Sequence, residues 1–173
     1  KNLEEKFKQL SKKQVKLIKV LPNSMNFSPQ DAACKKFFYL LSKYNMILIT
    51  HVGDEHSVEG GGINNTFGNP SHYKKWLDMF PKLKIIMAHV GSEGQSKDPM
   101  TNEYIDNFDI VLKLLRLYPN QLWADISAMS CAPARTKYLS KIIINKDIQQ
   151  QLLYGSDYPV AAIRPLVAIS LSK

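Results

Sequence analysis

The stretches NMILITHVG (residues 45–53) and LKIIMAHVG (residues 83–91) decide the fold of this chain. Each is a short run of mainly aliphatic residues that ends in histidine, valine and glycine. The apolar residues fill consecutive positions, which is typical of parallel strands that are buried on both faces of a sheet. The two stretches therefore predict parallel strands in an α/β protein.

Three further runs of strand length accompany these two stretches, and helical patterns separate them. The expected strands span residues 15–22, 45–53, 83–91, 121–127 and 151–159. The expected helices span residues 2–13, 28–44, 71–80, 102–118 and 135–150. This alternation predicts a parallel sheet whose strands pair in sequence order, with helices on its outer face. Two architectures remain open: a doubly wound open sheet, or part of a (β/α)₈ barrel, which takes about 250 residues when complete.

One helix start carries a clear signal in the sequence. Ser28 is the expected N-cap, Pro29 occupies the first helical position, and Asp31 follows three residues after the cap. This pattern resembles a capping box with a proline whose φ suits a helix. We therefore expect the second helix to begin directly after Ser28.

Composition and charge exclude several classes of protein. The chain has 173 residues, 45% of them hydrophobic and 22% charged, which excludes a disordered polymer and a collagen-like repeat. No apolar run approaches the roughly 18 residues of a membrane-spanning helix. The two cysteines lack CxxC spacing, which favours a reducing, cytoplasmic location. The net charge of +8 comes mostly from lysine, so we expect solvated helix faces and neither nucleic-acid nor membrane binding.

Ionisable residues gather where the expected strands end. His51 follows ILIT, His89 follows IIMA, and Asp157 follows YGS. We expect these side chains to converge at the carboxyl ends of the strands, where barrel enzymes carry their catalytic groups. The period of two in a strand predicts which residues share a face with each histidine: Ile47 and Ile49 with His51, and Ile85 and Met87 with His89.

These residues also suggest a chemistry. A single histidine at a strand end is more often hydrogen-bonded than a metal ligand. Two histidines in the similar contexts THVG and AHVG, together with an aspartate in GSDYP, are harder to explain by chance. Neutral imidazole and carboxylate are ligands that suit Zn²⁺, Fe²⁺ or Mn²⁺.

Several segments together resemble the amidohydrolase superfamily, in the branch that includes aminocarboxymuconate-semialdehyde decarboxylase. The similar segments are KVLP (19–22), ITHVG (49–53), GNP (68–70), FPKLKIIMAHVG (80–91), YPNQLWADIS (118–127) and LLYGSDYP (152–159). Their order and spacing match the last five strands of that family's barrel. The resemblance implies an α/β fold, a TIM (β/α)₈ barrel of metal-dependent hydrolase type. This chain would supply about strands 4–8, so we expect residues 1–173 to form a single domain that is incomplete at its N-terminus.

The resemblance also implies a role for each clustered residue. His51 would bind a divalent metal, with Zn²⁺ as the expected ion, and Asp157 would bind the same metal and take a proton from the attacking water. His89 would polarise the substrate or act on it as acid or base. The implied activity is metal-dependent hydrolysis of a small organic substrate. Non-oxidative decarboxylation at the same site and a non-catalytic α/β binding or assembly fragment remain alternatives.

The family's HxH pair, which supplies two further ligands, has no counterpart in this sequence. The other histidines are His56, in a glycine-rich loop, and His72, expected to be exposed at a helix start. We therefore expect the isolated chain to bind metal weakly and to be inactive. The barrel-interior surface that such a fragment exposes favours a homodimer.

Further polar residues near the strand ends are candidates for contact with the substrate. Lys19 matches the position of a metal-bridging lysine in some superfamily members, but a substrate-facing or buried, paired lysine is the simpler interpretation. Asp125 is a candidate to orient the substrate or a ligand, or it is a strand-end carboxylate with hydrogen bonds of its own. Cys131 and Arg135 lie where they would contact substrate, although entry into the following helix explains them equally well.

Overall fold

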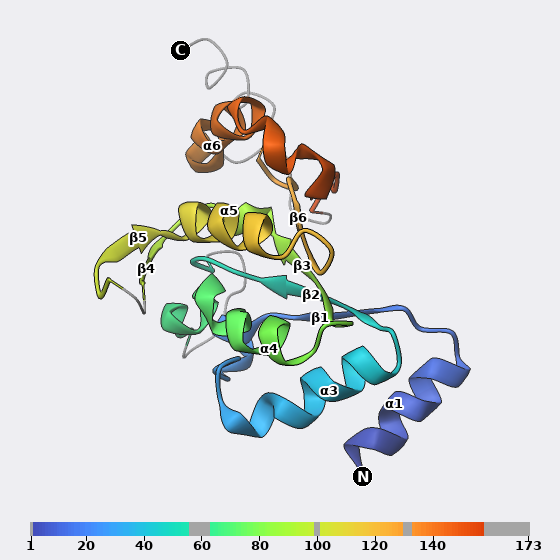
Figure 1. The fold of residues 1–173 in the computed structure, drawn as a ribbon. Helices are drawn as coiled ribbons and strands as arrows, with labels where there is room; N and C mark the ends of the chain where they lie inside the picture. Colours follow the sequence, from blue (N-terminus) through green and yellow to red (C-terminus); the bar gives the residue numbers. More distant parts are fainter. Residues whose placement is uncertain (1, 56–62, 99–100, 130–132, 158–173) are drawn as a thin grey trace.

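The computed structural model describes residues 2–55, 63–98, 101–129 and 133–157. Its centre is one parallel sheet, in the order β1-β2-β3-β6-β7 (Figure 1). The strands are β1 (Leu17–Val20), β2 (Ile47–His51), β3 (Lys84–Ala88), β6 (Leu122–Asp125) and β7 (Leu152–Leu153). The predicted pairing of parallel strands in sequence order is therefore confirmed, with β1 at one edge.

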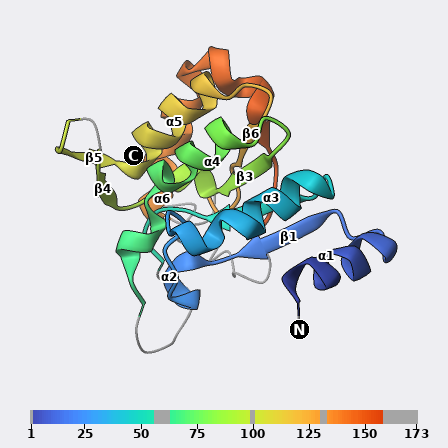
Figure 2. The same cartoon turned by 60° about the horizontal axis from the view of Figure 1, so that its bottom comes forward.

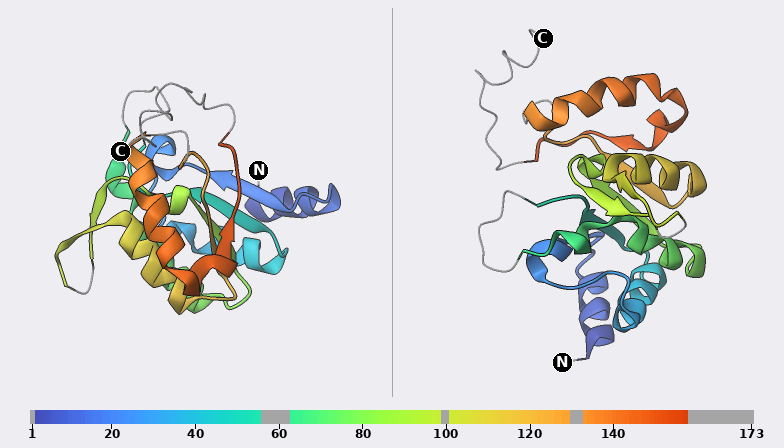
Figure 3. Two further views of the ribbon diagram at one scale, coloured as in Figure 1. Left: turned by 90° about the horizontal axis from the view of Figure 1, so that it is seen from above. Right: turned by 90° about the vertical axis from the view of Figure 1, so that its left-hand side faces the viewer.

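Helices α3, α4 and α5 lie side by side over the sheet (Figure 2), while α1 and α6 lie at opposite ends of the molecule (Figure 3). The helices are α1 (Leu3–Lys12), α2 (Pro22–Met25), α3 (Lys35–Lys43), α4 (Lys74–Met79), α5 (Asn107–Leu117) and α6 (Pro133–Ile144). Single 3₁₀ segments span Ala32–Cys34, Asn65–Gly68, Pro70–Tyr73, His89–Gly91 and Lys146–Gln151. In the described part of the chain, none of the helices has both the length and the apolar character that a membrane span requires.

The two faces of the sheet differ in burial. Leu48, Ile85 and Leu122 are neighbours in the register and are fully buried in the core beneath the helices. On the other face, the row Ile49, Ile86 and Trp123 is only partly buried. Leu17, at the edge of that same face, is 50% exposed. One face therefore carries the core, and the other is half open, as expected for part of a barrel.

This difference predicts the cost of removing a leucine from each face. Leu48→Ala should lower the free energy of unfolding by about 2–5 kcal/mol, because it leaves a cavity in the core. Leu17→Ala is the matched control and should cost less than about 1 kcal/mol, because half of that side chain is already exposed. Urea unfolding of both variants measures the two costs. Equal losses would contradict the assignment of the faces.

The second helix begins later than predicted. The described chain forms a turn after Ser28, in which Asp31 N–H donates to the Ser28 carbonyl at 3.1 Å, and the first helical residue is Ala32. The indole Nε1 of Trp76 donates to the Pro29 carbonyl at 2.7 Å in the buried core. That carbonyl therefore serves a tertiary contact instead of a helical hydrogen bond. Ser28 Oγ has no hydrogen-bond partner among the described residues, so the expected capping box does not form.

The predicted helix over residues 102–118 is also shorter than expected. Its first residues instead form β5 (Tyr104–Asp106), which pairs antiparallel with β4 (Gln95–Lys97). Helix α5 begins after Asp106, whose Oδ1 accepts the N–H of Phe108 at 3.0 Å. Because this carboxylate caps the helix, the preceding residues are free to pair as a hairpin.

Candidate metal and acid–base site

His51 ends β2 and is 4% exposed. Its Nε2 lies 3.2 Å from the Asp54 carbonyl oxygen, and its Nδ1 lies 3.5 Å from Glu55 Oε2. Burial lowers the pKa of His51 below its ordinary value, against the opposing charge of Glu55. The ring is therefore neutral near pH 7, and neutral imidazole is the form that binds metal ions.

His89 reaches the same region by a different route from the one predicted. The register pairs Ile85 with Leu48, so Ile85 and Met87 lie on the helix-covered face of the sheet. His51 pairs with Ala88 and lies on the opposite face. The prediction that Ile85 and Met87 share a face with His89 was therefore wrong. Strand β3 ends at Ala88, and His89 has a φ of +56°. This left-handed turn, which simple alternation cannot anticipate, brings the ring of His89 to 5.5 Å from that of His51, measured between centroids.

Ser127 and Asp125 hold the ring of His89. His89 Nδ1 lies 3.2 Å from the Ser127 carbonyl oxygen and 2.8 Å from Ser127 Oγ. The Ser127 hydroxyl donates its own proton to Asp125 Oδ1. Both oxygens next to Nδ1 therefore act as acceptors, so Nδ1 carries the ring proton and the lone pair lies on Nε2.

This arrangement predicts the tautomer of His89. Burial, together with the positive charge of Arg135, lowers the pKa of His89, so the ring is neutral slightly above pH 7. We expect long-range ¹H–¹⁵N spectra in that range to show His89 protonated at Nδ1. A ring protonated at Nε2 would contradict the assignment of Ser127 and Asp125 as its partners.

Asp157 completes the cluster. Its Oδ1 lies 3.8 Å from His89 Nε2, the nitrogen with the free lone pair. The structure thus brings His51, His89 and Asp157 to one place at the carboxyl ends of the strands, as the sequence predicted. Asp125 also lies there, and its Oδ1 accepts the backbone N–H of His89 at 3.1 Å.

The other candidates differ in their placement. Lys19 lies on the half-open face, level with Ile49 in the register, and it is exposed, so it is not the buried, paired lysine of the simpler interpretation. His72 was expected to be exposed, but it is partly buried, and burial lowers its pKa. His56 and Cys131 lie outside the described residues.

Sequence reasoning missed Glu55 and Ser127. Glu55 is 5% exposed, and its N–H donates to Asn65 Oδ1 at 3.1 Å, which anchors the segment after β2. Asn23 Nδ2 donates to the same oxygen at 2.9 Å. No periodic pattern marks Glu55, because it lies after the strand. Ser127 follows two residues after Asp125 and has the spacing of a local Asx turn, the only signal that would have revealed it.

The donors suit a divalent ion in type but not in number. His51 offers a neutral imidazole and Asp157 a carboxylate, which are zinc and manganese ligands. Across the described ranges, no group of three or more His, Cys, Asp and Glu side chains is arranged to hold an ion. A catalytic zinc site needs about three protein ligands, so these residues by themselves make a partial site.

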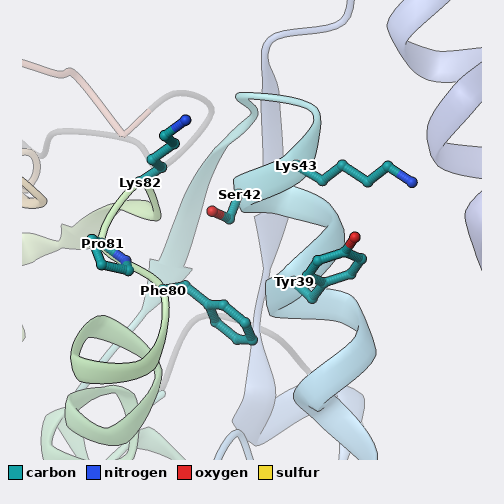
Figure 4. A pocket seen from close by; sticks show the side chains of 6 residues that line it. All are labelled: Tyr39, Ser42, Lys43, Phe80, Pro81 and Lys82. Carbon is teal, nitrogen blue, oxygen red and sulfur yellow. The ribbon is translucent and has the colours of Figure 1, made fainter.

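A separate cavity of about 430 Å³ lies between α3 and the segment after α4 (Figure 4). It is lined by Tyr39, Ser42, Lys43, Phe80, Pro81 and Lys82. Ser42 and Lys43 precede β2, and Pro81 and Lys82 precede β3. This cavity therefore lies at the amino ends of the strands, away from the clustered histidines.

Solved structures that are similar to this chain include TIM-barrel proteins. An uncharacterised TIM-barrel protein from Bordetella bronchiseptica matches at 14% identity with a TM-score of 0.64, covering 98% of this chain and 54% of that one. IDCase from Metarhizium anisopliae matches at 14% identity with a TM-score of 0.55, covering 98% and 54%. A dihydroxybenzoic acid decarboxylase from Polaromonas sp. JS666 with bound manganese matches at 12% identity with a TM-score of 0.45, covering 85% and 49%.

The chain thus spans about half the length of these solved structures. No curated protein sequence matches it. The family model for amidohydrolases matches residues 3–164, which is nearly the whole chain. That match and the parallel sheet confirm the resemblance and the expected barrel fold: the chain belongs to the amidohydrolase family.

Proposed function

We propose that this chain carries the acid–base residues and part of the metal site of a metal-dependent hydrolase that acts on a small organic substrate. The supporting observation is the cluster of His51, His89 and Asp157 at the carboxyl ends of the parallel strands. Ionisable side chains buried at such a position are costly unless they are paired, ligating or catalytic.

His51 and Asp157 are the residues that would hold the ion. A divalent ion with these donors would polarise the substrate and lower the pKa of nearby water. Asp157 then accepts the proton of the attacking water. His89, with its lone pair on Nε2 facing Asp157, moves a proton between that carboxylate and the leaving group. Ser127 and Asp125 keep the ring oriented throughout, because they fix the proton on Nδ1.

Decarboxylation would use the same residues in a different way. His89 would first take up a proton from solvent on Nε2 and then deliver it to the carbon that loses the carboxylate, so no water would be added to the substrate. A non-catalytic binding fragment would need neither the lone pair on Nε2 nor a metal. Reaction products therefore separate these functions.

The test is a substrate screen on the protein expressed from its complete reading frame, loaded with zinc or manganese. The panel contains small lactones, amides and aromatic carboxylic acids, and the readouts are acid release and carbon dioxide release. Chelator-sensitive hydrolysis that is lost in Asp157→Asn supports the proposal. Carbon dioxide release without hydrolysis would overturn it in favour of decarboxylation, and no turnover of any compound would favour the binding fragment.

The nucleotide sequence upstream of Lys1 offers a cheaper check. An HxH encoded there would supply the two ligands that raise the partial set of His51 and Asp157 to a complete one. A frame that encodes no such pair would remove the main support for metal-dependent catalysis.

A further inference from the structure

Arg135 is a buried cation to which the proposed reaction gives no task. It lies in the first turn of α6, and the residue is 6% exposed. Its Nη2 is 3.5 Å from Glu93 Oε2. Its Nε is buried, and it has no hydrogen-bond partner within the described part of the chain.

Such a guanidinium is unusual for a purely structural residue. Arginine stays charged at every relevant pH and presents five N–H donors in a rigid plane. Arg116 shows how an arginine in this protein is satisfied: Nε lies 2.6 Å from Asp147 Oδ2, and Nη2 lies 2.7 Å from Asn145 Oδ1. Arg135 is far more buried than Arg116, yet its ion pair with Glu93 is long, and no described residue bonds to its Nε.

The position of Arg135 connects it with the reacting cluster. Its partner Glu93 lies in the segment that directly follows the His89–Gly91 turn. The guanidinium therefore lies on the side of the site formed by α6 and the segment that follows His89.

We infer that Arg135 is the anion-binding residue of this site, and that it holds the carboxylate of a small organic acid through the Nε edge of its guanidinium. The inference rests on the proposed function, because it takes the cluster of His51, His89 and Asp157 as the reacting centre.

The charges around the site favour a carboxylate over a phosphate. Nε and Nη2 together form a fork that matches the two oxygens of a carboxylate. The surrounding carboxylates would repel a dianionic phosphate more strongly than a monoanion; they are Glu55, Glu93, Asp125 and Asp157. Glu93 already approaches Nη2, so a bound carboxylate takes over part of that pairing.

The test observes the arginine Nε–H signals of the chain by ¹H–¹⁵N spectroscopy, without metal and without turnover. The chain has three arginines, Arg116, Arg135 and Arg164, so the spectrum is simple and Arg116 is an internal control. The Arg135 signal is the one missing in Arg135→Lys. Benzoate is the probe, benzamide its neutral counterpart of similar shape, and inorganic phosphate the competing anion.

We expect benzoate to shift the Arg135 signal in a saturable manner while the Arg116 signal stays in place. Benzamide should cause no shift, and phosphate should bind more weakly than benzoate. Arg135→Lys keeps the charge but loses the fork, so benzoate should bind at least about tenfold more weakly, as followed by the backbone signals. Glu93→Gln should tighten benzoate binding, because it removes the competing carboxylate.

An Arg135 signal that stays unmoved up to the solubility limit of benzoate would overturn the inference, as would equal shifts with benzamide. Preferred binding of phosphate would overturn the assignment of a carboxylate. These titrations need only the wild-type chain, so they decide the matter even if a variant does not fold. Benzoate binding without any turnover would leave this inference standing while the proposed function fails. Turnover of neutral substrates with no effect of Arg135→Lys on KM would support the proposed function and contradict the inference about Arg135.

Discussion

His89→Ala is expected to lower kcat by about 10²–10⁴-fold in the protein expressed from its complete reading frame, the range typical of a lost general acid or base. The physical reason is the direction of the ring. Ser127 accepts the proton of Nδ1, which leaves the lone pair of Nε2 facing Asp157 at 3.8 Å. Steady-state kinetics on the substrate found in the screen measures the loss. The metal content should stay at the wild-type level, because His89 is assigned to proton transfer.

His72→Ala is the matched control for this variant. His72 is a partly buried histidine in the 3₁₀ segment Pro70–Tyr73, and it lies outside the cluster. Its removal should leave kcat within about twofold of the wild type. Wild-type turnover by His89→Ala would show that another group moves the proton. Loss of metal from His89→Ala would show that His89 is a ligand.

His51→Ala and Asp157→Ala are expected to lose the metal, in contrast to His89→Ala, which should keep it. Each should weaken zinc binding by more than about 100-fold, because loss of a ligand exceeds the roughly 10–100-fold cost of losing a residue that only orients one. Turnover should fall together with metal content in both variants. Competition with a coloured chelator measures the affinity directly.

Asp54→Ala is a useful control here, because it keeps the backbone carbonyl next to His51 Nε2 and removes only the side chain. It should bind zinc far more tightly than His51→Ala does. If His51→Ala keeps the metal affinity of the wild type, the role assigned to this histidine is wrong.

Much of the fold was predictable because the signals are local and repeated. Continuous apolar runs indicated the parallel strands, and their alternation with helices gave the order of the sheet. Helix starts were less predictable, since they depend on contacts made far away in the sequence. The carbonyl of Pro29 is taken by Trp76, 47 residues later, which nothing near Ser28 indicates.

The candidate site was predictable in its strand-end residues and unpredictable in what surrounds them. His51, His89 and Asp157 follow recognisable strands, so their convergence followed from the topology. The partners of these residues lie in turns: Glu55 beyond β2 and Ser127 beyond β6. Even the side chain of His89 is placed by a backbone conformation with positive φ, and not by the predicted alternation of strand residues. Turn geometry has no period, so pattern analysis could not place these side chains.

The most direct test of the central claim is the metal content of the wild-type protein expressed from its complete reading frame. The measurement is elemental analysis after loading with zinc, manganese or iron and removal of excess ion. The account predicts about one divalent ion per chain, since His51 and Asp157 supply ligands of the right type at one place. Protein that retains no metal under any of these loading conditions would contradict a metal-dependent function for this cluster.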